Sequence, residues 1–136
     1  MKRYLLDTHI LVWLLTKNNR LNKNVREDIE YFQHLFYVSV ESLREIVILQ
    51  SLNKIILNDT VDEIAEKLDE HQIEIIPIEI NHVKTLAALP VLVNHNDPFD
   101  KMLIAQSITN QYTLISNDIK FSLYKDFGLR LRINEI

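Results

Sequence analysis

The sequence predicts an α/β fold in which a mostly parallel sheet is covered by helices on both faces. Short apolar segments with strand character alternate with segments of helical periodicity, as in right-handed βαβ units. The length of 136 residues suits a single domain, residues 1–136, and 47% apolar with 25% charged residues is an ordinary globular composition. The single glycine disfavours an all-β fold, which would need many glycine-rich turns.

The first part of the chain predicts one strand and two helices. The strand is expected at Lys2–Leu6, which is short and apolar and stops at Asp7. Thr8–Thr16 is apolar at nearly every position, which predicts a buried helix. Asn22–Phe32 is mostly polar but carries three large apolar residues at helical spacing, which indicates a helix with one buried side.

The next elements are a strand and two helices with recognisable starts. Leu35–Ser39 is short and apolar and predicts the second strand. Val40–Leu52 is expected to be a helix capped by the serine that precedes it. Thr60–Glu70 opens with a threonine followed three residues later by Glu63, a capping box that predicts an amphipathic helix.

A third strand, a helix and a loop follow. The strand is expected at Glu74–Ile78, where Pro77 marks either the end of the strand or an exposed edge of the sheet. Ile80–Leu89 predicts a helix that stops near the following proline. Val91–Asn96 is expected to be a connecting loop.

The last part of the chain predicts two more strands. Pro98–Asn110 is expected to be a helix with proline at its first position. Tyr112–Ser116 predicts the fourth strand, and a short helix should follow it to about Lys125. Leu129–Ile133 predicts the final strand.

The composition excludes several functional classes. The absence of cysteine removes disulfides, thiol nucleophiles and cysteine metal sites, and it fits a reducing compartment. With one glycine there is no glycine-rich phosphate loop. The longest apolar run, Ile10–Leu15, is too short to cross a bilayer, and Asp7 interrupts any signal-peptide pattern, so we expect a cytoplasmic protein without membrane contact. The net charge of −4 argues against binding nucleic acid by bulk charge, although a divalent metal could supply positive charge locally.

Four carboxylates stand beside the most apolar segments. Asp7 and Asp118 lie at or just past the ends of predicted strands, the edge at which parallel α/β sheets form their sites. Glu45 and Asp100 are each followed closely by a run of apolar residues, and a buried ionised carboxylate needs a partner or a metal. Each also has a structural explanation: Asp7 and Asp118 could cap helices, Glu45 could pair with a nearby cation, and Asp100 could complete a capping box.

Asp97 immediately precedes Pro98 and is interpreted mainly as the cap of the following helix. The four other carboxylates, without cysteine or paired histidine, suit a hard cation such as Mg²⁺ or Mn²⁺. Such sites usually serve phosphoryl chemistry by activating a water molecule, and without the metal one carboxyl should have a raised pKa. His9 and His95 flank the acids and could touch substrate, but they are interpreted as ordinary polar residues.

Four segments occur in an order that resembles the PIN-domain family, in particular its VapC-type toxins from toxin–antitoxin pairs. The segments are YLLDTHILVWLL, SVESLREI, LPVLVNHNDPFDKMLIAQS and LISNDIKFSLY. They cover nearly the whole chain, and NDPFDKMLIAQ is the most specific of them.

The resemblance implies a three-layer α/β/α sandwich and a metal-dependent ribonuclease in which Mg²⁺ or Mn²⁺ activates water against RNA. It implies a homodimer and a cognate antitoxin whose C-terminal segment covers the site. The family's functional positions correspond to two groups of residues here. The acids are Asp7, Glu45, Asp100 and Asp118, and the hydroxyls are Thr8 and Ser116.

The sequence departs from relatives at a few positions near these acids. Arg44 stands where many relatives have Trp, and Lys101 replaces a frequent Arg, which keeps the charge but loses the bidentate fork. Lys101 therefore remains a candidate phosphate contact. Two other functions stay open: a phosphatase with Asp7 as nucleophile, in which His9 stands where such enzymes usually place an acid, and a non-catalytic module that binds a basic peptide in an acidic cleft.

Overall fold

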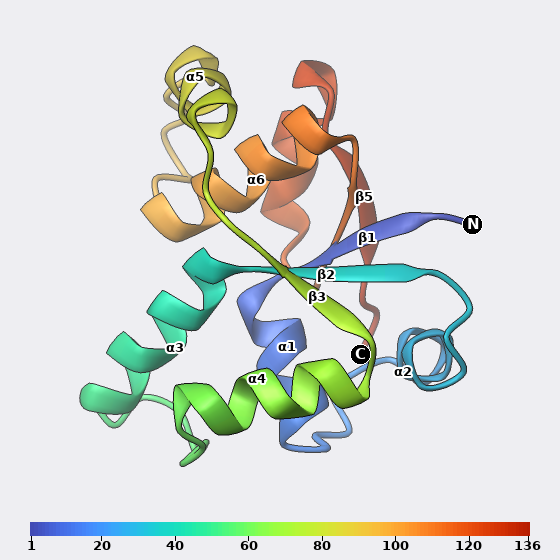
Figure 1. Ribbon diagram of the computed structural model, residues 1–136. Helices are drawn as coiled ribbons and strands as arrows, with labels where there is room; N and C mark the ends of the chain where they lie inside the picture. Colours follow the sequence, from blue (N-terminus) through green and yellow to red (C-terminus); the bar gives the residue numbers. More distant parts are fainter.

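A five-stranded parallel sheet organises the molecule, as the computed structural model of residues 1–136 shows (Figure 1). The strands are β1 (Arg3–Leu6), β2 (Leu35–Ser39), β3 (Ile73–Ile76), β4 (Thr113–Ser116) and β5 (Arg130–Ile133). Their spatial order is β3-β2-β1-β4-β5, and every neighbouring pair is parallel. Leu5 at the centre of the sheet lies opposite Tyr37 on one side and Leu114 on the other.

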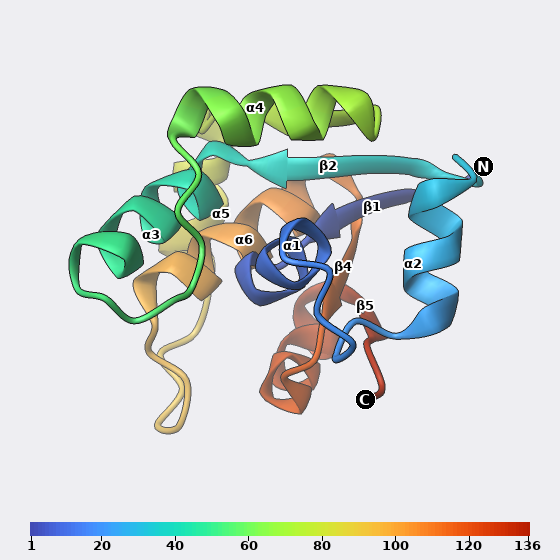
Figure 2. The same cartoon turned by 90° about the horizontal axis from the view of Figure 1, so that it is seen from below.

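Helices cover both faces of the sheet. They are α1 (Thr8–Leu15), α2 (Lys23–Glu30), α3 (Val40–Ser51), α4 (Val61–Glu70), α5 (Ile80–Ala88), α6 (Pro98–Asn110) and the 3₁₀ helix η1 (Ile119–Phe127). Figures 1 and 2 show α1, α2 and α4 on one face and α5, α6 and η1 on the other. The α3 helix lies at the carboxyl end of the strands, in contact with α1 and α6. The predicted three-layer α/β/α architecture is confirmed.

The alternation of side chains along β1 supplies both hydrophobic cores. Tyr4 and Leu6 pack with the apolar residues of α1, α2 and α4, whereas Leu5 packs with Leu103 and Ile104 of α6. A central parallel strand buried on both faces should be mainly apolar, and β1 is apolar and buried from Tyr4 to Leu6, with only Arg3 at its start exposed.

The α1 helix is apolar all round because it is buried all round. Seven of its eight residues are buried, and Trp13 is among them, in the core. No helix of the chain combines the length and the apolar character that crossing a bilayer requires.

The predicted helix starts are confirmed. Ser39 accepts a hydrogen bond from the Glu41 amide at 3.0 Å, and Thr60 and Glu63 form both bonds of the capping box. Several boundaries differ from expectation by one or two residues, and two of these differences have a clear physical reason. The third strand occupies Ile73–Ile76 rather than Glu74–Ile78, because Pro77 has no amide to continue the ladder. The last helical segment is a 3₁₀ helix that runs to Phe127 and ends at Gly128 with φ 101°.

Candidate active site

The acidic residues lie together at the carboxyl edge of the sheet, at the point where the order of the strands reverses. Strands β2 and β3 lie on one side of β1 and strands β4 and β5 on the other, so the carboxyl ends of β1 and β4 border a switch point. A cleft of about 370 Å³ opens there. It is lined by Asp7, His9, Glu45, Asp97, Asp100, Asn117, Asp118, Ile119 and Phe121. The structure thus brings together all four acids that the sequence singled out.

Asp7 is the most deeply buried of these acids, with 3% of its surface exposed. One carboxylate oxygen accepts a hydrogen bond from the Thr8 amide at 2.6 Å, and the other accepts one from the Ser116 hydroxyl at 2.7 Å. Burial raises the pKa of Asp7, and these hydrogen bonds oppose the rise. Asp7 therefore caps α1 and lines the cleft at the same time.

Ser116 connects two of the acids. Its hydroxyl donates to Asp7 and accepts a hydrogen bond from the Asp118 amide at 3.0 Å. Asp118 in turn caps η1 by accepting from the Lys120 amide at 2.9 Å. The single hydroxyl at the end of β4 thereby links the side chain of Asp7 to the backbone of Asp118.

Glu45 reaches the cleft from α3 and is half-buried. Burial raises its pKa, and the neighbouring carboxylates of Asp97 and Asp7 raise it further. Arg44 does not neutralise it, because that guanidinium pairs with Glu41 at 2.8 Å. Thr8 fastens α1 to α3 through a 3.0 Å hydrogen bond from its hydroxyl to Ser42.

Asp97 and Asp100 occupy the first turn of α6. Asp97 caps the helix by accepting hydrogen bonds from the amides of Phe99 and Asp100 at 2.8 and 3.0 Å, as predicted. Burial, followed by repulsion from the acids around it, raises the pKa of Asp100 to about 8. Lys101 does not line the cleft, because consecutive side chains of a helix point about 100° apart.

His95 is the residue that the sequence interpretation undervalued. Its side chain is 4% exposed, and its Nε2 atom lies 3.2 Å from a carboxylate oxygen of Asp100 without a hydrogen bond. Its Nδ1 atom lies 3.0 Å from the Tyr124 hydroxyl. Burial lowers the pKa of His95. The ligand atoms of His95, Asp100 and Asp118 all lie within 4.8 Å of one another. In the sequence, the only sign that His95 lies in the cleft is its position two residues before Asp97.

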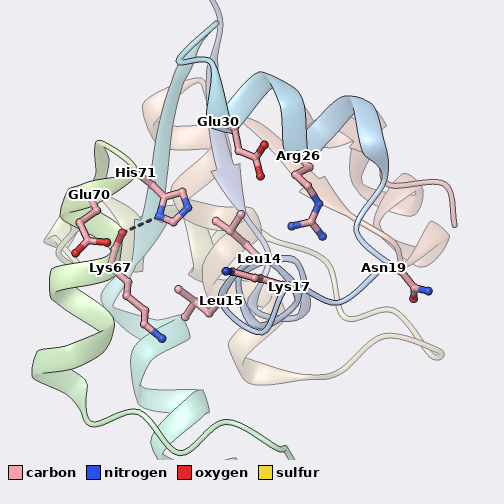
Figure 3. A pocket seen from close by; sticks show the side chains of 9 residues that line it. All are labelled: Leu14, Leu15, Lys17, Asn19, Arg26, Glu30, Lys67, Glu70 and His71. Atoms are coloured by element: carbon pink, nitrogen blue, oxygen red, sulfur yellow. Dashed lines mark hydrogen bonds between the residues drawn. The ribbon is translucent and has the colours of Figure 1, made fainter.

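The largest cavity lies elsewhere. About 800 Å³ in volume, it is bordered by the ends of α1, α2 and α4 (Figure 3). Lys17, Arg26 and Lys67 line it together with Glu30 and Glu70, and none of the predicted site residues does. Cavity volume alone therefore does not locate the acidic site.

The fold and the cleft define an α/β protein with a carboxylate cluster at the switch point of a parallel sheet. The chain belongs to the PIN domain family, whose model matches residues 4–126. PIN domains are nucleases, and membership places this chain in that class. No curated protein sequence matches the chain.

Solved structures share the fold at low sequence identity. VapBC2 from Rickettsia felis, bound to a DNA fragment of its promoter, has a TM-score of 0.66 and 21% identity over 96% of this chain and 98% of its own. A toxin–antitoxin complex from Klebsiella pneumoniae has a TM-score of 0.62 and 20% identity over 98% and 99% of the two chains. VapBC-5 from Mycobacterium tuberculosis has a TM-score of 0.59 and 16% identity over the whole of both chains.

Proposed function

We propose that this chain is a metal-dependent endoribonuclease and the toxin of a type II toxin–antitoxin pair. The observation that carries the proposal is the convergence of Asp7, Glu45, Asp100 and Asp118 in one cleft. Membership of the PIN domain family supports hydrolysis of a phosphodiester, and similarity to VapBC complexes supports an antitoxin partner. We further propose that this chain forms a homodimer and that its substrate is RNA, as the family resemblance implies.

The donor set of the cleft fits a hard divalent cation. Asp7, Glu45, Asp100 and Asp118 offer carboxylate oxygens, which Mg²⁺ and Mn²⁺ prefer. Burial, and then repulsion from the neighbouring acids, raise the pKa of Asp100 to about 8, and a cation would relieve this repulsion. We propose Mg²⁺ as the cofactor, with Mn²⁺ as a substitute.

The chain's own residues position these ligands before substrate arrives. The Ser116 hydroxyl and the Thr8 amide orient the carboxylate of Asp7, while Asp97 fixes the first turn of α6 and with it Asp100. When bound, a divalent ion lowers the pKa of a coordinated water and neutralises charge on the scissile phosphate. Because the chain carries a net charge of −4, RNA would be drawn to this cleft only when its negative charge is compensated.

Cleavage of a structured RNA pool by the purified, partner-free protein tests the proposal. With Mg²⁺ or Mn²⁺ we expect cuts at a few defined positions, and chelator should abolish them. Asp7→Asn and Asp100→Asn keep the side-chain shape but remove a charged ligand, so each should lower the rate by about two orders of magnitude or more. Ser51→Ala, on an exposed turn of α3, is the control that should leave the rate unchanged.

Cleavage that persists in chelator, or in both aspartate variants, would refute the assignment. Metal binding without cleavage of any RNA would favour a non-catalytic module with an acidic cleft. Turnover of a small phosphomonoester with a trapped aspartyl-phosphate on Asp7 would instead favour the phosphatase alternative.

A further inference from the structure

His95 is a buried imidazole held firmly against the acidic cleft. It follows Leu92, to which it is paired by an isolated bridge, and its ring packs edge-on against Phe121 and Tyr124 at centroid distances of 5.2 and 5.3 Å. The side chain is 4% exposed, so its polar atoms must be satisfied from within the protein.

The hydrogen bonds of Tyr124 favour one tautomer of the neutral His95 ring. The Tyr124 hydroxyl donates its hydrogen to the backbone oxygen of His95 at 3.3 Å. In this arrangement the hydroxyl has no second hydrogen for Nδ1, so Nδ1–H donates to its oxygen across 3.0 Å. In the neutral ring Nε2 is therefore an unprotonated acceptor, as it is in histidines that bind metals.

The lone pair on Nε2 of His95 faces the carboxyl group of Asp100. Nε2 has no hydrogen-bond partner, although an oxygen of Asp100 lies 3.2 Å away. A proton on the Asp100 carboxyl relieves the repulsion between these two acceptors in the metal-free protein, and a metal ion can take the place of that proton. Two ligands about 2.1 Å from one ion, at right angles to each other, are about 3 Å apart, close to the observed distance. A carboxylate oxygen of Asp118 lies within 4.8 Å of both atoms.

We propose that Nε2 of His95 is a direct ligand of the ion in this cleft, together with Asp100 and Asp118, and that it raises the affinity of the site for Mn²⁺ relative to Mg²⁺. The inference rests on the metal site of the proposed function and adds a nitrogen donor to it. Imidazole favours transition metals, whereas Mg²⁺ prefers oxygen alone. Tyr124 then acts as the outer partner that fixes the ring orientation.

Pulsed electron paramagnetic resonance of the full-length protein titrated with Mn²⁺ tests this directly. We expect a ¹⁴N coupling to the ion that changes to a ¹⁵N coupling when the histidines are ¹⁵N-labelled. His95→Gln should remove the coupling. The matched control is His9→Gln, since His9 also lines the cleft but is exposed, and this variant should keep the coupling.

Affinities provide a second measurement. Calorimetric titration should show that His95→Gln lowers the preference for Mn²⁺ over Mg²⁺ by about tenfold, because the lost nitrogen matters little to Mg²⁺. Tyr124→Phe keeps the ring and His95, so it should keep the coupling while weakening Mn²⁺ binding by about tenfold. This variant remains informative if His95→Gln fails to fold, which circular dichroism would show.

The outcomes separate this inference from the function on which it rests. Mn²⁺ bound without nitrogen coupling, or coupling that survives His95→Gln or disappears in His9→Gln, would overturn the role of His95 and leave an all-carboxylate site in place. Absence of any Mn²⁺ binding would overturn the metal site itself.

Discussion

Ser116 holds together two acids that are far apart in sequence. Its hydroxyl donates to Asp7, 109 positions away, and accepts from the amide of Asp118. The residue is completely buried, so neither bond can be replaced by solvent. The Ser116 oxygen therefore helps to fix the relative positions of Asp7 and Asp118.

Replacing Ser116 with Ala should loosen the site and destabilise the protein. We expect about 1–3 kcal/mol lower stability, because a buried amide and a buried carboxylate each lose a partner, and about tenfold weaker Mn²⁺ binding. Thermal unfolding and calorimetric titration measure the two effects. Ser51→Ala makes the same chemical change on an exposed turn and should alter neither. Unchanged Mn²⁺ affinity in Ser116→Ala would contradict the positioning role.

Asp100 should make the metal-free protein less stable as the pH rises. Its pKa is about 8 in the folded chain against an ordinary value of 3.8, so the folded state holds a proton that the unfolded state releases. The stabilisation from this group is complete below about pH 4 and is lost as the pH rises through 8. Asp100→Asn, which carries no charge, should raise the melting temperature in chelator by roughly 5 °C at pH 8 and much less at pH 4.

Thermal unfolding at both pH values measures this difference. Asp126→Asn removes an equivalent charge from an exposed position outside the cleft and should show no such pH-dependent gain. If Asp100→Asn and the wild type lost stability equally between the two pH values, the raised pKa of Asp100 would be refuted.

At the scale of elements, the cleft is built from helix starts. Asp7, Asp97 and Asp118 cap α1, α6 and η1, so the amino ends of three helical segments face the same small volume. The positive ends of the helix dipoles favour negative charge there and partly offset the crowding of carboxylates. The structural and functional interpretations of these acids are therefore compatible with each other.

Substitutions of Asp97 test whether the cap of α6 also supports metal binding in the cleft. Asp97→Ala should cost about 1 kcal/mol of stability and weaken Mn²⁺ binding severalfold, because the first turn of α6 carries Asp100. Thr60→Ala removes a cap of similar strength from α4, far from the cleft, and should reduce stability without changing Mn²⁺ affinity. Unfolding and titration of both variants provide the comparison.

A rescue variant completes that comparison. Serine is as good an N-cap as aspartate, so Asp97→Ser should recover both stability and Mn²⁺ affinity. If it recovers stability alone, the carboxylate of Asp97 itself contributes to binding and is not merely a cap.

At the scale of the whole molecule, metal binding and folding should be linked. The acids come from the ends of β1 and β4 and from α3 and α6, so they form a site only in the folded chain. Mn²⁺ at about 100 times its Kd should stabilise the protein by about 2.7 kcal/mol, a rise in melting temperature on the order of 10 °C.

Asp7→Asn and Asp100→Asn should lose most of this rise, while the exposed Asp126→Asn should keep it. Thermal scans at several Mn²⁺ concentrations measure the dependence. A rise of the same size in all four proteins would indicate binding outside the cleft.

The sequence by itself was enough to predict the helices and strands and to single out the acids that line the cleft. Local patterns sufficed for the capped starts at Ser39, Thr60 and Asp97, because a cap and the amides it binds are separated by only two or three residues. Glu45 and Asp100 could be recognised as candidate site residues from their apolar neighbours in the sequence, because a charge next to a buried segment needs a partner.

Only the tertiary structure decided which residues meet. The order β3-β2-β1-β4-β5 brings Ser116 to Asp7, and no local pattern encodes a contact between strands so distant in the chain. The loop before α6 turns His95 inward, where burial against Phe121 and Tyr124 makes it part of the cleft, while helix geometry directs Lys101 away from it. The direction of a side chain in a loop or at a helix end depends on how distant parts of the chain pack around it. Local sequence patterns do not reveal that packing.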